Sequence, residues 1–304
     1  MNKKTKKIIS KENNYFDAIL TQFEENMHNV IDKYDGAMLL ELDKLSVTSS
    51  GTLIDNISNR SKVKDILDNL KKQLNKAGYG NQFDSIINRY SKINTYQREI
   101  FGSLGYRGLY GINDLYKVEA VFEYSYEDLT PAEKVGRSVI NQSKINTTKI
   151  SNRMRGLFSE AFFGSLKFNQ LRESLVNNTN TLEQWSYAVA NTGVMAVDSA
   201  IHNTVADELG LEYREYVGGI WVNTRPFCYA ILKGSNPNTN GVMPKTRKDK
   251  DFGSWLKGCE KHINYWHIDE IALLDNEQGE KMKNVLLNAG GWNCHHRFMV
   301  AEAR

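Results

Sequence analysis

Two stretches of the chain decide its fold: WVNTRPFC, residues 221–228, and GGWNCHHRF, residues 290–298. Each combines a cysteine, an arginine and an aromatic residue with residues that favour tight turns. We call residues 221–228 the first motif and residues 290–298 the second motif. Two such turns far apart in the sequence predict a closed unit, with the first motif at its start and the second at its end. The remaining sequence predicts helices that lead up to this unit.

The residues of the two motifs are suited to closing such a unit. Pro226 fixes φ after Arg225, and the pair Gly290 and Gly291 lets the backbone bend sharply. Arg225 and Arg297 can each donate to several carbonyl oxygens and so hold irregular loops together. The residues expected to act as this structural clasp are Thr224, Arg225, Pro226, Cys228, Gly290, Gly291, Trp292, Cys294, His295 and Arg297.

The cysteines allow three interpretations. Because the motifs are expected to meet, Cys228 and Cys294 should lie in one side-chain layer, covered by Phe227 or Trp292. They are small buried apolar residues, a disulfide, or, with His296, a zinc site, since thiolates and imidazoles are suitable zinc ligands. His262, His267 and His295 are alternative imidazole ligands. No Cys-x-x-Cys pair is present, so the three interpretations stay open, and no other cofactor is indicated.

Composition excludes several classes of protein. The 304 residues can bury a good core, as one large domain or as two to three small ones. With 40% hydrophobic residues, 25% charged residues and four prolines, the chain is neither disordered nor fibrous. A net charge of +3 is too small to indicate nucleic-acid binding by itself. No apolar run approaches the roughly 20 residues of a membrane span, and no signal peptide is present, so we expect synthesis in the cytoplasm and no membrane partner.

Helical periodicity dominates the N-terminal part. Apolar residues at three- and four-residue steps predict helices over 13–34, ending at Gly36, over 63–74, ending at Gly78 and Gly80, and over 83–101. The basic residues before the first helix are expected to form a frayed, solvated tail, or alternatively an arm that binds phosphate or a partner. They are Lys3, Lys4, Lys6, Lys7 and Lys11. Residues 102–129, with a possible strand at 118–124, are expected to be a boundary.

The boundary predicts two domains: residues 1–128, a helical adaptor, and residues 129–304. The second begins with helices over 129–209, since Thr130-Pro131-Ala132-Glu133 is typical of a helix start. Gly164-Ser165 should break the first long helix, and a capping box at Thr181 should begin another that ends at Gly210. His202 on that helix is expected to be a packed residue rather than a ligand.

Residues 210–304 predict an α+β unit. Tyr213 to Val222 is rich in aromatic and β-branched residues and predicts a strand, and 298–300 predicts a last one. Between them we expect a long exposed loop over 233–254, with Trp255 in loop-like surroundings, and short helices over 269–274 and 281–287. The fold class is therefore mainly α with a C-terminal α+β domain. Its long helices lead into a small sheet closed by two Cys-containing turns.

The order of these features resembles the minor head proteins of tailed phages, the Mu F-like head morphogenesis family. In that family a turn with arginine, proline and cysteine follows a strand, and a second turn with asparagine, cysteine, histidine and arginine closes the domain. The matching residues are Thr224, Arg225, Pro226, Cys228, Asn293, Cys294, His295, His296 and Arg297. The resemblance covers roughly residues 130–304. The chain differs from the family pattern at Trp221 and at Ala190-Asn191-Thr192-Gly193, where the family often has charged residues.

The resemblance implies a structural minor capsid protein of the virion, made in the cytoplasm of a bacterial host. Such a protein is present in multiple copies per virion, associates with the portal protein and with capsid or scaffold proteins during head assembly, and can be ejected with the DNA. We expect no enzymatic activity. Two alternatives stay open: a metal-dependent nuclease that uses His295 and His296, and a DNA-binding packaging factor that uses the N-terminal lysines and the basic loop at 245–250.

Overall fold

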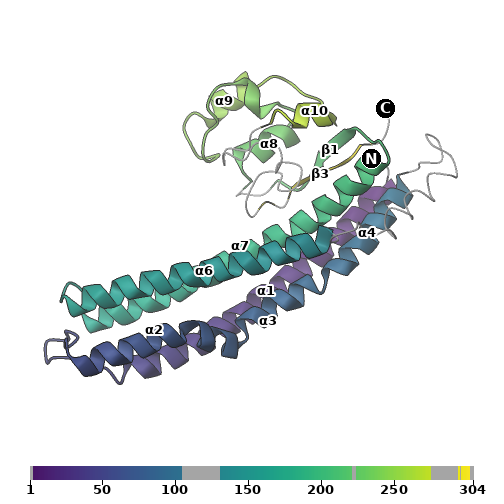
Figure 1. Cartoon of the computed structure of the whole chain (residues 1–304). Coiled ribbons are helices and arrows are strands. Elements are labelled where there is room, and N and C mark those ends of the chain that lie inside the picture. Colours follow the sequence, from purple (N-terminus) through teal and green to yellow (C-terminus); the bar gives the residue numbers. More distant parts are fainter. Residues whose placement is uncertain (1–2, 105–130, 221–223, 275–293, 295, 302–304) are drawn as a thin grey trace. The chain divides into compact units, whose positions relative to one another are not determined.

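The computed structural model describes residues 3–104, 131–220, 224–274, 294 and 296–301. The protein is mainly α-helical with a small antiparallel sheet toward its C-terminus (Figure 1), as the sequence predicts. The helices are α1 (Lys3–Leu42), α2 (Ile57–Ala77), α3 (Tyr79–Ile87), α4 (Tyr90–Ser103), α6 (Pro131–Phe162), α7 (Phe168–Glu208), α8 (Pro226–Leu232), α9 (Phe252–Gly258) and α10 (Ile268–Ile271). The strands are β1 (Tyr213–Val217), β2 (Trp266–His267) and β3 (Arg297–Val300).

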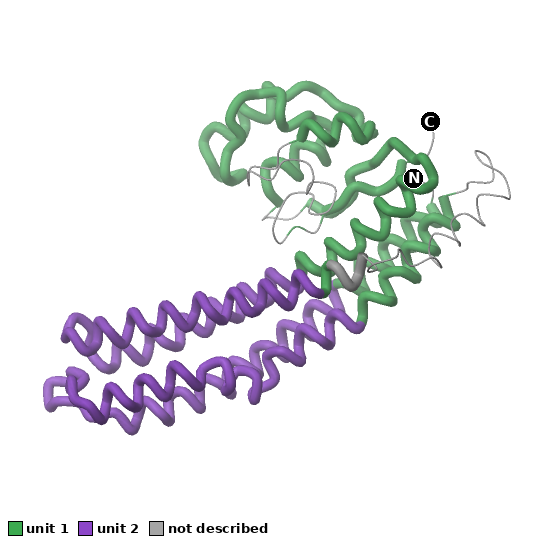
Figure 2. The backbone as a smooth tube through the Cα atoms, viewed as in Figure 1, with its two compact units in different colours: residues 1–16, 89–136, 191–304 green, residues 17–88, 137–190 purple. Residues whose placement is uncertain are grey.

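The chain divides into two compact units, and each is assembled from separate segments (Figure 2). Unit 1 consists of residues 1–16, 89–136 and 191–304, and unit 2 consists of residues 17–88 and 137–190. Both units therefore take segments from each side of residue 128. The expected division into two domains at 128/129 stays a prediction.

Unit 2 is held together by contacts among parts of α1, α6 and α7 and the whole of α2 and α3. The ring of Phe23 in α1 packs edge-on against Phe83 in α3, with centroids 5.3 Å apart. Between α3 and α7, the hydroxyls of Tyr79 and Ser186 lie 2.9 Å apart. The helix α2 has clear end signals: the Asn56 side chain accepts from the Asn59 amide at its start, and Gly78, with φ of 100°, ends it.

Unit 1 contains the sheet and the helices that cover it. The strand order is β2-β1-β3, and both pairings are antiparallel. Arg214 pairs with Trp266 on one side and with Val300 on the other, so β1 is the central strand. One apolar cluster joins β1, α8, α10 and β3 through Tyr216, Phe227, Ile271 and Phe298, all at most 1% exposed. This core positions the first motif against the residues that precede β3.

Several predicted boundaries in the N-terminal part are wrong. Helix α1 begins at Lys3 and continues through Gly36 to Leu42, so the lysines are not a frayed tail. Their side chains are exposed, whereas Ile8 and Ile9 between them are buried against Ile100 and Met299. The single helix expected over 83–101 is divided into α3 and α4, and Gly80 lies inside α3 rather than ending α2.

The helix expected to begin at Thr181 does not begin there. Helix α7 runs without interruption from Phe168 to Glu208, and the Thr181 hydroxyl donates to the Asn177 carbonyl one turn earlier. Buried residues on both sides of this position, Leu175 and Leu182 among them, maintain the helix. The break at Gly164 (φ +76°) and the end at Gly210 (φ +65°) are confirmed.

In the C-terminal part, the strands predicted at 213 and 298 are confirmed as β1 and β3, although β1 ends at Val217. The region 233–254 is mostly loop, as expected, but Trp255 is a buried residue of α9, packed with Ala230 and Cys259. The predicted strand at 118–124, the helix at 281–287 and the Thr130 cap lie outside the described residues. Among the described residues, none of the helices combines the length and apolar character needed to cross a membrane.

Candidate functional site

The first motif is the start of a helix rather than a turn after a strand. Arg225 is the N-cap residue of α8, with extended backbone, and Pro226 occupies the first helical position, where its missing amide hydrogen costs nothing. The third helical residue is Cys228, whose side chain is 1% exposed. The chain thus leaves the sheet at Val217, and the expectation that it leaves a strand at Cys228 is wrong.

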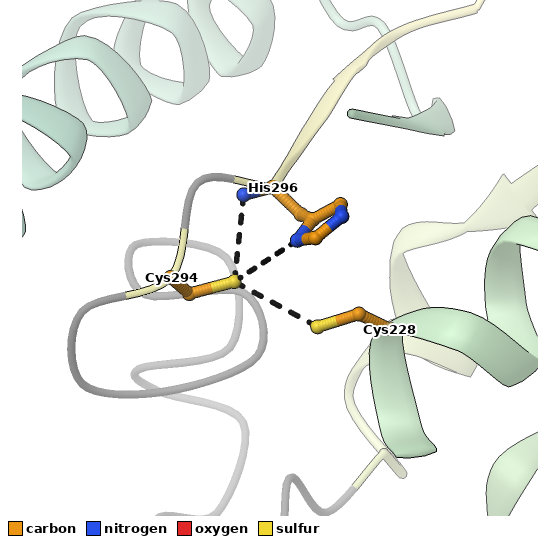
Figure 3. Close-up of side chains that lie close together, drawn as sticks. All are labelled: Cys228, Cys294 and His296. Atoms are coloured by element: carbon orange, nitrogen blue, oxygen red, sulfur yellow. Dashed lines mark hydrogen bonds between the residues drawn. The ribbon is translucent and has the colours of Figure 1, made fainter. Parts of the chain in front are cut away.

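The second motif brings Cys294 and His296 to the same place. Their segment precedes β3, and Figure 3 shows the Cys294 sulfur facing both Cys228 of α8 and the ring of His296. The sulfur atoms of Cys228 and Cys294 lie 3.7 Å apart, and Cys294 Sγ lies 3.4 Å from Nδ1 of His296. All three side chains are buried. The predicted meeting of the two motifs is therefore confirmed, across 66 residues of sequence.

The ring of His296 is fixed by its second nitrogen. Nε2 lies 2.8 Å from the carbonyl oxygen of Gly219, and because a carbonyl only accepts, Nε2 carries the hydrogen. In the neutral ring, Nδ1 then presents a lone pair toward the sulfur of Cys294. Gly218 permits this arrangement: its φ is +152°, and a Cβ at this position would overlap the imidazole. The ring also stacks on Tyr216, with an interplanar angle of 5°.

The two thiols do not ionise alike. A hydrogen bond from Cys228, aided by contacts with His296, holds the pKa of the Cys294 thiol well below its usual range although burial opposes this. The pKa of Cys228 is raised well above its usual range, first because its thiol proton is used in the bond to Cys294 and then by burial. Burial likewise raises the pKa of Tyr216, whose hydroxyl donates to Cys228 Sγ at 3.2 Å. The cluster therefore gathers two cysteine sulfurs and an imidazole lone pair, which are metal-ligand donors.

A second polar cluster lies behind the same strand. The guanidinium of Arg297 is 2% exposed and contacts two fully buried carboxyls, Glu12 Oε2 at 2.5 Å and Asp198 Oδ2 at 2.7 Å. The contact with Glu12 is an aligned hydrogen bond, whereas the contact with Asp198 is a close ion pair without that alignment. Arg297 thus contacts carboxyl groups of two helices, and the expectation that it fastens loops through carbonyl oxygens is wrong.

His202 and Gln97 complete this cluster in a chain of hydrogen bonds. The Val300 amide donates to Nε2 of His202 at 2.7 Å, so Nδ1 carries the hydrogen and donates to Gln97 Oε1 at 2.8 Å. The Gln97 amide nitrogen then donates to Glu12 and to Asp198. Burial, followed by the nearby arginines, holds the pKa of His202 well below its usual range. His202 is therefore a packed, neutral residue, as predicted.

Among the described residues, the candidate ligands His262 and His267 lie outside the group formed by Cys228, Cys294 and His296. His262 stacks on Trp266 with ring centroids 3.6 Å apart, and His267 caps α10 by accepting from the Asp269 amide. Phe227 is fully buried in the cluster that contains both cysteines, as expected for a covering ring. The remaining clasp residues of the second motif, Gly290, Gly291, Trp292 and His295, lie outside the described residues.

Sequence reasoning missed Glu12, Gln97, Asp198 and Tyr216. Two of them carried a usable signal. Glu12 lies four residues before Phe16 on the apolar stripe of α1, and Asp198 lies between Val194 and His202 on a buried face of α7. A charged residue within an apolar stripe indicates a buried partner of opposite charge.

Comparison of the chain with protein-family models found no matching family, and searches of curated proteins and of solved structures found no match either.

Proposed function

We propose that this protein is a structural minor head protein of a tailed bacteriophage, related in its C-terminal part to the Mu F-like family that the two motifs resemble. The observation that carries the proposal is the contact between Cys228 and Cys294. It brings together the two motifs on which the resemblance rests, although a long segment separates them in sequence. A chance similarity of two short stretches would not require them to form one buried cluster.

In this proposal the protein works by binding rather than by catalysis. Its place is in the virion, in multiple copies, between the portal protein and the capsid or scaffold proteins. Unit 2 offers exposed apolar side chains for such contacts: Leu40 at the end of α1, Ile57 at the start of α2 and Phe163 after α6 are each at least two-thirds exposed. Hydrogen bonds join the loop at 46–54 to residues 164–168, such as the one from the Phe168 amide to the Gly51 carbonyl at 2.9 Å. They bring the segment between α1 and α2 near the segment between α6 and α7.

The direct test is quantitative mass spectrometry of purified particles and of assembly intermediates. We expect the protein in both, at a constant ratio to the portal protein. Its absence from both would refute the proposal. A second arm uses co-purification with the portal protein: Ile57→Ser and Phe163→Ser should weaken it. Val242→Ser is the matched control, since Val242 is equally exposed but lies in unit 1.

The alternative activities have a separate test. His296 faces sulfur atoms and the Gly219 carbonyl, and the described donor cluster that contains it has no carboxylate to assist a nuclease. We expect no cleavage of plasmid DNA with Mg²⁺, Mn²⁺ or Zn²⁺. Cleavage that is lost in His296→Ala would contradict this. DNA contact through the exposed lysines at the start of α1 is a further proposal, and it predicts binding that weakens steeply with salt.

A further inference from the structure

We propose that Cys228, Cys294 and His296 bind a single zinc ion in unit 1. In a tetrahedral site with Zn–S bonds of about 2.3 Å and a Zn–N bond of about 2.0 Å, two sulfurs lie about 3.8 Å apart and a sulfur and a nitrogen about 3.5 Å apart. The observed separations are 3.7 Å between the sulfurs and 3.4 Å from Cys294 Sγ to His296 Nδ1. Two of the three distances between donor atoms thus already match those of a tetrahedral zinc site.

The third distance, between the Cys228 sulfur and the His296 ring nitrogen, requires only a small adjustment. One ligand atom from each of the three residues lies within 4.8 Å of the other two, so the Cys228 sulfur and the imidazole nitrogen need to approach by at most about 1.3 Å. Side-chain rotation of Cys228 in the first turn of α8 can supply this.

The groups around the three donors form hydrogen bonds that orient and stabilise metal ligands. The Gly219 carbonyl holds the hydrogen of His296 on Nε2 and so places the lone pair on Nδ1, the nitrogen that faces Cys294 Sγ, which is the usual role of a carbonyl beside a ligating histidine. The His296 amide points at Cys294 Sγ from 3.4 Å, and the Tyr216 hydroxyl donates to Cys228 Sγ. Both contacts stabilise thiolates, which is the form in which cysteine binds zinc.

The charges and protons of the binding step balance. Zn²⁺ displaces the thiol protons of Cys228 and Cys294, and two thiolates with a neutral imidazole leave the buried site without net charge. This matters because an unpaired charge among Phe227, Phe298 and Ile271 would be costly. Three protein donors leave the fourth position to a water molecule.

A disulfide or a pair of plain buried thiols would give the two cysteines different surroundings. A disulfide requires sulfurs about 2.05 Å apart, and the observed 3.7 Å is a non-bonded contact. Plain buried thiols would need neither an imidazole of fixed tautomer nor a hydroxyl and an amide directed at the sulfurs. The zinc site does not depend on a role in the virion, and its tests use the isolated protein.

The experiment measures metal in the full-length protein purified without chelators. We expect one zinc per chain in the wild type, and at least a tenfold loss of zinc in Cys228→Ser, Cys294→Ser and His296→Gln. Cys259→Ser is the matched control. Cys259 is also buried, but it lies in a separate cluster with Trp255 and should keep full zinc occupancy.

A second measurement needs no variant and so remains decisive if the substitutions impair folding. Wild-type protein stripped of metal and titrated with Co²⁺ should give a tetrahedral visible spectrum and a sulfur-to-cobalt band of the strength expected for two thiolates, saturating at one equivalent. Zinc should compete the cobalt away. A wild type without zinc that forms no cobalt–thiolate band, a Cys228–Cys294 disulfide found by peptide mapping of freshly prepared protein, or zinc retained in Cys228→Ser would each overturn the proposal.

Discussion

Neutralising Asp198 should destabilise the protein far more than neutralising Glu12, although both carboxyls contact the same arginine. Arg297 supplies one positive charge to two buried acids. Burial raises the pKa of Glu12 well above its usual range, and the neighbouring Asp198 raises it further, against the opposing effect of Arg297. One arginine can balance only one of the two acids, and the raised pKa of Glu12 favours Glu12 as the acid that keeps its proton. Glu12→Gln then replaces one neutral group with another, whereas Asp198→Asn leaves Arg297 as an uncompensated buried charge.

The burial of this cluster sets the magnitude. Both carboxyl side chains are 0% exposed and Arg297 is 2% exposed, so water cannot compensate a lost partner. Breaking a buried ion pair costs about 3–5 kcal/mol, which we expect for Asp198→Asn. Glu12→Gln should cost less than about 1 kcal/mol, on the scale of one imperfect hydrogen bond. At roughly 2–4 °C per kcal/mol for a domain of this size, the Tm should fall by about 10 °C in the first variant and by about 2 °C in the second.

Circular dichroism measures the Tm, and amide hydrogen exchange shows where stability is lost. The Val300 amide is the informative probe because it donates to His202 within this cluster. Asp43→Asn is the control: Asp43 pairs with Arg172 on the surface of unit 2, and loss of an exposed pair should change the Tm by no more than about a degree or two. Equal losses in the two buried variants, or a larger loss in Glu12→Gln, would refute the proton assignment.

Three further changes test other parts of the structure. Deletion of residues 1–11 removes Ile8 and Ile9 from their buried contacts and should cost at least about 3 kcal/mol in urea unfolding; an unchanged midpoint would show that the start of α1 is a tail after all. Trp255→Ala should cost about 3 kcal/mol because the indole is 5% exposed, and a loss below about 1 kcal/mol would place it in loop-like surroundings. Burial raises the pKa of Asp35 to about 6 despite its hydrogen bond from Thr179, so the folded protein binds more protons than the unfolded chain between about pH 4 and pH 6. The free energy of unfolding should therefore fall as pH rises through this window, by about 1–2 kcal/mol after allowance for solvent screening, and Asp35→Asn should remove this part of the pH dependence.

The parts of the fold that the sequence predicts correctly have local physical causes. Gly78 and Gly210 adopt positive φ where the helices end, and Pro226 fits a first helical position. Each signal acts within a few residues, so it can be recognised without knowledge of the rest of the fold. The Thr181 capping box is a local signal that fails. Burial along both halves of α7 stabilises a continuous helix, and this outweighs about 1 kcal/mol from a cap.

Of the contacts that join distant segments, some could be predicted from the sequence and others could not. The meeting of Cys228 and Cys294 was predictable because both motifs flank a sheet that has to close. The pairing of Glu12 with Arg297 spans 285 residues, and nothing near either residue specifies the other. The sequence could have indicated only that Glu12 and Asp198 interrupt apolar stripes and that each required a partner. The choice of Arg297 depends on how α1, α7 and β3 pack within unit 1.

The register of one strand connects the two clusters. Successive side chains of an extended segment point to opposite faces. Cys294, His296 and Phe298 therefore face α8 and Tyr216, whereas Arg297 and Met299 face the start of α1. A shift of one residue in the pairing of β3 with β1 would turn Arg297 toward Cys228 and Tyr216 and would carry His296 and Cys294 away from Cys228. Neither cluster would then be satisfied, so the Cys228–Cys294–His296 cluster and the buried ion pairs each oppose the register that would disrupt the other. The adjacent histidine and arginine of the second motif thus specify the strand from both of its faces.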